Sequence, residues 1–269
     1  MPYMTLSDGL PLYYEETGQG SPVLFVPGWT MTTAMWRHQV EYFGKSHRVI
    51  TLDLRGAGRS GKTQDRHSLI DYSTDVGELL DGLRLTGAAV VAWAMGVSVT
   101  VHLLAILGTP RLSGFVWVDH SPSFLTEAGW EFPLGGDFTN EDLDEMCGMQ
   151  LSDRVAAVDN LLDLMFHHPL GEADREDFYR SIFQTPSTVA ESMLRQVATT
   201  DLRPLLGRVT LPTLVVNGEK SVVPHGVCGW LASHLPEGRC QIIPDAGHAP
   251  FWDAPEAFNL VVAEFLSSL

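Results

Sequence analysis

The chain has 269 residues, 45% of them hydrophobic and 19% charged, which is enough to bury a sizeable core as one large domain. Its 33 acidic and 17 basic residues give a formal charge of −16, which disfavours binding to nucleic acid or to an anionic membrane surface. We expect a cytoplasmic location, because no apolar run approaches the roughly 18 residues of a membrane span and the N-terminus lacks a secretory signal pattern.

Short apolar runs and helical spacings alternate over the first 120 residues. Residues 4–16 alternate well enough to predict a hairpin. Apolar runs without a polar face lie at 23–26 and 115–118, typical of strands buried on both sides of a parallel sheet. Further strands are predicted at 48–53 and 88–92. Helices are expected between them, at 35–43, 72–85 and 97–107. The Gly-rich turn at 54–60 lacks the spacing of a phosphate-binding loop and indicates a tight crossover. Strand and helix units joined by right-handed crossovers predict an α/β fold with a doubly wound, mostly parallel sheet.

The alternation stops after residue 120. Residues 121–201 predict helices rich in methionine and aromatic residues, interrupted at Pro133, Pro169 and Pro186. An insertion of this kind usually covers the site side of a sheet, so we expect a helical cap over 121–201 and a core domain formed by 1–120 and 202–269. The strand pattern then resumes, at 213–217 and 240–243, with helices expected near 225–234 and from about residue 255.

Cysteine and histidine positions give no metal or disulfide signature. Cys147, Cys228 and Cys240 are scattered and odd in number, so we expect neither a disulfide framework nor a CxxC metal site. Among the ten histidines only His167 and His168 are adjacent, and neighbouring residues on a helix point in different directions. We therefore predict no metal, and nothing in the sequence implies an organic cofactor.

The pattern with the clearest chemical meaning lies at residues 90–97, VVAWAMGV. It predicts a buried strand, a sharp turn and the start of a helix, with the small residues Ala92 and Gly96 on either side of Ala94. In a nucleophile elbow, small residues two positions before and after a serine let a strained turn close without a Cβ clash. Alanine has no lone pair with which to attack. Ser98, one helical turn later, is expected inside the buried helix and does not replace it.

Three further motifs accompany this one in a characteristic order, Pro27-Gly28-Trp29, Arg55-Gly56-x-Gly58-x-Ser60 and Gly247-His248-x-Pro250-Phe251. On these motifs the chain resembles the α/β-hydrolase fold superfamily over essentially its full length. The resemblance implies that position 94 is the place of the nucleophile and that His248 is the general base that takes the nucleophile's proton. It also implies an oxyanion hole made by the backbone N–H groups of Trp29 and Met95.

The acid that would orient His248 departs from the commonest pattern of that family. Many members carry an aspartate in the loop after the strand that here ends at Asn217, but Ser221 stands at that place. We prefer Asp119, at the end of an earlier strand, over Glu219, because some branches of the family place their acid there. A carboxylate at either strand end can reach the ring N–H of His248. The alternative is a turn or cap role for Asp119.

Three functions are compatible with Ala94. In the first, Ala94 replaces a serine, and the native protein is a serine hydrolase that cleaves an ester, lactone or thioester of a hydrophobic small molecule, as the Met-rich cap suggests. In the second, Ala94 is native and His248 acts as a base without a covalent step, as in the cofactor-independent dioxygenases of this fold. In the third, the pocket belongs to a non-catalytic receptor. Retention of His248 with an acid favours catalysis. We expect a monomer or homodimer.

Overall fold

The computed structural model describes residues 3–108 and 111–269. Within them, eight strands form one sheet in the order β1-β2-β4-β3-β5-β6-β7-β8. Strand β2 runs antiparallel to β1 and β4, and the remaining neighbours are parallel. The strands are β1 Tyr3–Thr5, β2 Pro11–Thr17, β3 Pro22–Val26, β4 Arg48–Leu52, β5 Ala88–Trp93, β6 Leu112–Val118, β7 Thr213–Gly218 and β8 Gly238–Ile243. The predicted doubly wound, mostly parallel sheet and its opening hairpin are confirmed.

Strand β5 lies in the middle of the sheet and is buried on both sides. Val90 and Ala92 belong to one hydrophobic cluster, whereas Val91 and Trp93 belong to the other. Alternate residues of a strand point to opposite faces, so the two clusters are the two faces of the sheet. This explains why the strand sequences carry no polar face.

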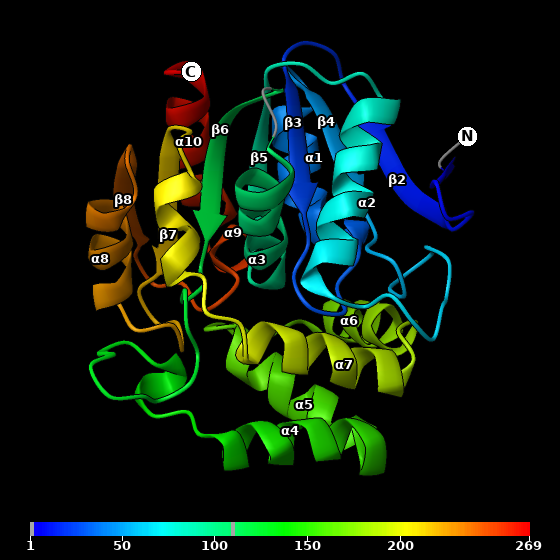
Figure 1. Ribbon diagram of the computed structural model, residues 1–269, viewed down its shortest axis with the longest axis vertical. Helices are drawn as coiled ribbons and strands as arrows, with labels where there is room; N and C mark the ends of the chain where they lie inside the picture. Colours follow the sequence, from blue (N-terminus) through cyan, green and yellow to red (C-terminus); the bar gives the residue numbers. More distant parts are fainter. Residues whose placement is uncertain (1–2, 109–110) are drawn as a thin grey trace.

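Helices cover both faces (Figure 1). In the view of Figure 1, α2 Leu69–Gly82 and α3 Met95–His102 lie in front of the sheet, and α8 Gly226–His234 packs on the same side of β7 and β8. The opposite face is covered by α1 Arg37–Phe43, α9 Pro250–Asp253 and α10 Pro255–Ser267. Short helical turns complete the described elements at η1 Thr33–Trp36, η2 Leu103–Leu107, η3 Leu134–Gly136 and η4 Arg203–Arg208.

The strand order predicts a ligand site beyond the carboxyl ends of the central strands. Strand β3 pairs with β4 on one side and with β5 on the other. The chain therefore adds β4 on one side of β3, and then β5 and the later strands on the other side. In doubly wound sheets, ligands bind where the order reverses, outside the carboxyl ends of the strands. Here these ends lead into Pro27 after β3 and Ala94 after β5. The two predicted motifs therefore meet at this edge.

Four helices lie beyond this edge of the sheet and next to one another in Figure 1. They are α4 Asn140–Ser152, α5 Arg154–Met165, α6 Glu172–Phe183 and α7 Ser187–Ala198. We call residues 121–201, which contain them, the helical segment. Its first part, before Asn140, is irregular apart from the turn η3. The division into core and cap stays a prediction.

The Gly-rich turn 54–60 is a structural crossover between β4 and α2. The Arg55 guanidinium donates two hydrogen bonds to the Asp75 carboxylate on α2, at 2.5 and 2.6 Å, and both side chains are buried. A Cβ at Gly58 would lie 2.2 Å from Oδ2 of Asp53, so this position requires glycine. The turn thereby ties the middle of α2 to the segment that follows β4.

The expectation that the cysteines do not pair is wrong for two of them. Cys228 on α8 and Cys240 on β8 form a disulfide, with their Cα atoms 5.5 Å apart, and Cys147 is free and buried. Helix α8 packs directly on β8, which brings together two residues that are 12 positions apart in the sequence. Disulfides persist mainly in oxidising compartments, so this pair lends no support to a cytoplasmic location.

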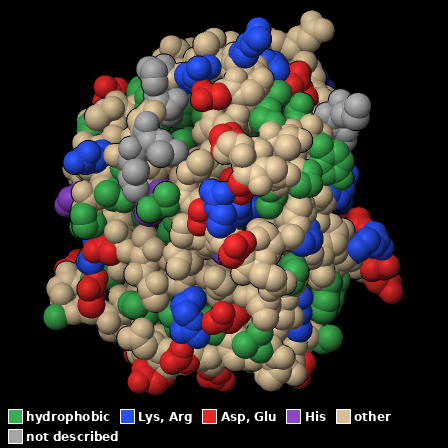
Figure 2. Space-filling view, turned by 45° about the vertical axis from the view of Figure 1, so that its right-hand side comes forward, with side chains coloured by type: hydrophobic (Ala, Val, Ile, Leu, Met, Phe, Trp, Pro, Cys, Tyr) green, Lys and Arg blue, Asp and Glu red, His purple; other side chains and the backbone are tan. Residues whose placement is uncertain are grey.

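Acidic and basic side chains lie close together over the face shown in Figure 2. Several arginines at the surface are held in ion pairs, among them Arg175 with Asp159 and Asp163, and Arg195 with Glu191 and Asp144. In the described ranges, 3–108 and 111–269, no helix is at once long and apolar enough to cross a membrane.

Candidate active site

Ala94 occupies a strained turn between β5 and α3. Its backbone angles are φ 49° and ψ −119°, a region that L residues rarely adopt and that costs roughly 1–3 kcal/mol. A Cβ at Gly96 would lie 2.5 Å from the carbonyl oxygen of Val26 and 2.8 Å from that of Pro27, so glycine lets α3 approach the end of β3. The Ala94 N–H donates to the carbonyl of Val118 at 3.1 Å, which ties the turn to β6. The predicted elbow geometry is therefore present.

His248 and Asp119 are joined by a hydrogen bond. Nδ1 of His248 lies 2.7 Å from Oδ2 of Asp119, although the residues are 129 positions apart. Asp119 is fully buried at the end of β6. With Nδ1 committed to the carboxylate, we assign its proton to that nitrogen, which leaves Nε2 as a hydrogen-bond acceptor on the pocket side.

Two further donors hold the Asp119 carboxylate. The Gly218 N–H donates to Oδ1 at 3.1 Å, and the Ser221 hydroxyl donates to Oδ2 at 2.5 Å. Burial raises the pKa of Asp119 above its ordinary value, and the hydrogen bonds from His248, Ser221 and Gly218 oppose this rise. Ser221 was absent from the sequence-based site. The signal for it is its place in the loop after β7, where many relatives carry the acid itself.

The competing acid lies elsewhere. Glu219 accepts a hydrogen bond from the Asp245 N–H at 3.2 Å and pairs with Lys220 at 3.3 Å. Within the part of the chain that the structure describes, the side chain that bonds the His248 ring is that of Asp119. The geometry thus brings together Asp119 and His248, and it does not bring Glu219 to them.

Trp29 and Met95, whose N–H groups are predicted to form the oxyanion hole, both lie beside the elbow. Met95 is the first residue of α3, so its N–H has no partner within the helix. Trp29 follows β3, and its indole N–H donates to the carbonyl of Ala190 on α7 at 2.8 Å. Both residues line the same pocket as Ala94 and His248.

Trp93 packs against the elbow, as the sequence indicated. Its indole N–H donates to the backbone carbonyl of His248 at 2.7 Å, and the centroids of the two rings are 5.2 Å apart. The residue before the elbow thereby also positions the loop that carries the histidine.

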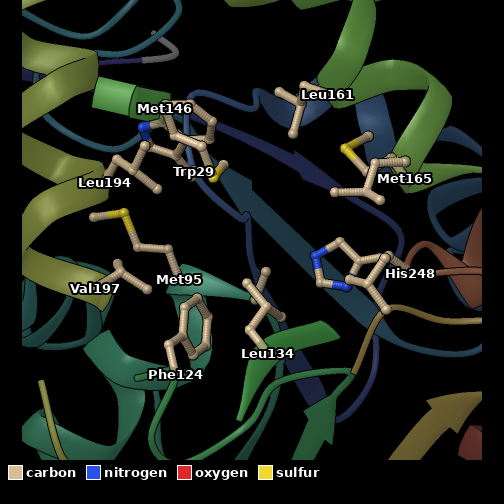
Figure 3. Close-up of a pocket in the computed structure, with 13 residues that line it drawn as sticks. Trp29, Met95, Phe124, Leu134, Met146, Leu161, Met165, Leu194, Val197 and His248 are labelled. Carbon is tan, nitrogen blue, oxygen red and sulfur yellow. The ribbon is translucent and has the colours of Figure 1, made fainter. Parts of the chain in front are cut away.

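The pocket beside Ala94 has a volume of about 620 Å³, including space open to solvent. Its apolar lining comes from both the sheet edge and the helical segment. In Figure 3 the His248 ring projects among apolar side chains, and among all the described lining residues it is the one titratable group. The lining residues are Trp29, Ala94, Met95, Phe124, Leu134, Met146, Leu161, Leu164, Met165, Leu194, Val197, Val222 and His248.

A second histidine is buried behind the elbow. Nε2 of His120 lies 2.8 Å from the Ser98 hydroxyl, and both side chains are almost completely buried. Burial lowers the pKa of His120 to about 3, so its imidazole is neutral at physiological pH. Ser98 is enclosed in α3, as expected, and does not line the pocket of Ala94.

The chain matches the family model described as alpha/beta hydrolase fold over residues 21–255. It therefore belongs to the α/β-hydrolase family. It is 28% identical over 254 residues to a pimeloyl-[acyl-carrier protein] methyl ester esterase of Nitrosomonas europaea, covering 92% of this chain and 96% of that protein. It is 24% identical over 246 residues to karrikin insensitive 2 receptor IA of Petunia hybrida, covering 89% and 88%.

The solved structure of an esterase from Exiguobacterium antarcticum superimposes with a TM-score of 0.92. The two chains share 22% identity, and 98% of each is covered, which establishes the common fold. Esterases and other hydrolases recur among the relatives, which supports hydrolase activity in general terms.

Proposed function

We propose that this chain is the nucleophile-to-alanine form of a serine hydrolase that cleaves ester bonds. The observation that carries the proposal is the strained elbow at Ala94, which lines one pocket together with a His248 already bonded to Asp119. Such strain persists only where the surrounding structure enforces it, and it clusters at active sites. An alanine gains nothing from this conformation, whereas a serine there would share the pocket with the base.

The chemistry follows from the positions of these groups. With a serine at position 94, Nε2 of His248 takes the hydroxyl proton while the oxygen attacks the ester carbonyl carbon. The N–H groups of Trp29 and Met95 stabilise the resulting oxyanion. His248 then protonates the leaving alcohol, and a water molecule, deprotonated by the same nitrogen, releases the acid. Asp119 stabilises the imidazolium at each stage. Alanine cannot form the acyl enzyme.

The pocket favours a hydrophobic small-molecule substrate. Its walls are leucine, valine, methionine and aromatic side chains, and Met95, Met146 and Met165 give them flexible thioethers that adapt to irregular apolar shapes. The helical segment supplies much of this lining, so we assign it the role of a cap. The Nitrosomonas europaea relative is, by its name, a methyl ester esterase, which supports an ester as the bond cleaved.

A second candidate is a receptor or a non-covalent base enzyme. It is favoured by one specific observation: the chain as it stands holds an ordered Asp119–His248 pair beside an apolar pocket with no hydroxyl at position 94. The Petunia hybrida relative is named as a receptor. In this case the pocket binds a small molecule without acyl transfer.

Turnover of activated esters and lactones by the alanine chain and by its Ala94→Ser variant separates these functions. The proposal predicts a gain of at least about 10³-fold, since loss of a serine nucleophile costs up to about 10⁶-fold in kcat. The matched control adds His248→Asn to the serine variant and removes the gain. Two results would show that the proposal of ester hydrolysis at position 94 is wrong. One is equal activity of the alanine and serine forms; the other is a folded serine variant that binds these esters or lactones without cleaving them.

A further inference from the structure

Three potential metal ligands converge at the surface beside the loop that carries His248. Nε2 of His167 lies 3.1 Å from Oδ1 of Asp245, and Nε2 of His168 lies 3.2 Å from Oδ2. All the ligand atoms lie within 4.8 Å of one another. The histidines follow α5 in the helical segment, whereas Asp245 follows the sheet strand β8.

The premise that adjacent histidines diverge does not hold here, because they are not helical. Helix α5 ends at Met165, and Phe166 is extended, with φ −109° and ψ 135°. After this change of direction the two rings lie with their centroids 4.9 Å apart, and both face Asp245. The sequence predicts that His167 and His168 lie in a helical region, where adjacent side chains diverge. Because α5 ends at Met165, both rings can contribute to one site.

Asp253 fixes the backbone on both sides of the cluster. Its Oδ2 accepts hydrogen bonds from the N–H of His167 at 2.9 Å and from the N–H of Gly247 at 2.7 Å. One carboxylate thus joins the segment after α5 to the loop after β8. The side chains of His167, His168 and Asp245 are 36%, 51% and 68% exposed, so an ion can reach them and small rotations can bring them to it.

We propose that His167, His168 and Asp245 form a binding site for a transition-metal dication of the zinc type. Two imidazole nitrogens and one carboxylate oxygen suit zinc, whereas magnesium and calcium prefer oxygen ligands alone. Ligands at about 2.0–2.2 Å from a tetrahedral zinc lie about 3.3–3.6 Å apart. The ligand atoms here lie within 4.8 Å of one another, so small side-chain rotations bring the two nitrogens and one Asp245 oxygen to that spacing. Both imidazoles bind the metal through an unprotonated Nε2, so any proton on that nitrogen is released to solvent when the ion binds. Glu219, which accepts the Asp245 N–H, and the overall charge of −16 add negative potential.

A bound ion would join two parts of the pocket wall. Met165, two residues before His167, lines the pocket, and its carbonyl accepts the N–H of Ala249, the residue after His248. The ion therefore restrains the end of α5 against the His248 loop. This role is structural and does not depend on the reaction proposed for the pocket.

Equilibrium dialysis of the intact chain against Zn²⁺, with metal analysis, tests the site without any activity assay. We expect about one zinc per chain and, at a hundredfold excess over Kd, a rise in Tm of about 5–10 °C. The Co²⁺ form should show the visible absorption of a low-symmetry site. His168→Ala and Asp245→Asn, one from each segment, should each weaken binding at least tenfold, since even indirect partners of metal ligands contribute that much.

The matched control is His225→Ala, which removes another exposed histidine and should bind zinc like the parent. Mg²⁺ should leave Tm unchanged. Circular dichroism confirms that each variant is folded. Binding only at millimolar zinc, or equal binding by the parent, His168→Ala and Asp245→Asn, would overturn the site.

Discussion

Asp119→Asn, placed in the Ala94→Ser background, tests the assignment of the acid. The asparagine carbonyl can still accept the Gly218 N–H, but its amide group then faces Nδ1 of His248 and the Ser221 hydroxyl. An amide donates to Nδ1, so the imidazole proton moves to Nε2. In that tautomer His248 cannot take a proton from the nucleophile.

The magnitude follows from the contacts that change. The charge-assisted bond to His248 contributes about 1.5–3 kcal/mol, and the wrong tautomer adds to its loss. Together they predict a fall in kcat/KM of about 10⁴-fold, equivalent to about 5.5 kcal/mol in the barrier.

Stability should change differently from activity. Burial raises the folded-state pKa of Asp119, so its ionised form is disfavoured by folding, and this cost is present once the pH exceeds the folded pKa. At neutral pH, replacing the charge therefore removes a cost while it also removes hydrogen bonds, and we expect the free energy of unfolding to change by less than about 2 kcal/mol.

The assay is ester hydrolysis by the Ala94→Ser and Ala94→Ser/Asp119→Asn variants, combined with urea unfolding of both. Ala94→Ser/Glu219→Gln is the matched control and should keep full activity, because the Glu219 carboxylate is directed to Asp245 and Lys220. An asparagine variant within tenfold of its parent, or a loss of activity in the glutamine control instead, would refute the assignment.

Three further perturbations test the fold around the site. Gly96→Ala should lower the free energy of unfolding by about 1–3 kcal/mol, because the new Cβ would lie 2.5 Å from a backbone oxygen. Gly148→Ala, at a helical position with open space around it, should instead raise the free energy of unfolding by about 0.5–1 kcal/mol. Equal effects of the two substitutions in urea unfolding would contradict this. The Cys228–Cys240 disulfide closes a loop of 12 residues, so its reduction should lower the free energy of unfolding by about 3 kcal/mol. Non-reducing peptide mapping should find the intact bridge. A chain with three alkylatable thiols before reduction would disprove the pairing. Burial lowers the pKa of His120 in the folded state to about 3, whereas the unfolded chain protonates this residue below about pH 6.5. The free energy of unfolding should therefore fall by up to about 1.4 kcal/mol per pH unit as the pH drops from 6.5 toward 3. His120→Gln should flatten that part of the urea-unfolding profile, and an unchanged slope would count against this prediction.

Local patterns predicted the sheet and its central turn. Apolar runs such as residues 23–26 and 88–92 identify buried strands, and the small residues on either side of Ala94 predicted a turn whose strain the structure shows at φ 49°. These features depend on neighbours within a few residues, and sequence periodicity reports such short-range constraints directly.

Contacts across the fold were harder to foresee. The choice between Asp119 and Glu219 depends on which strand end faces His248, 129 residues away from Asp119. The disulfide requires the packing of α8 on β8, and the histidine pair requires the exact end of α5. Each depends on tertiary geometry, which spacing along the chain does not encode.

Covalent labelling of position 94 tests the central proposal most directly. An activated phosphonate ester, which traps serine hydrolases, should add one equivalent to Ala94→Ser, and peptide mass spectrometry should place the adduct at residue 94. The same reagent should leave the alanine chain unmodified and should react far more slowly when His248→Asn is added to the serine variant. A folded serine variant that stays unlabelled, or labelling of the alanine chain to the same extent, would contradict the proposed nucleophile position.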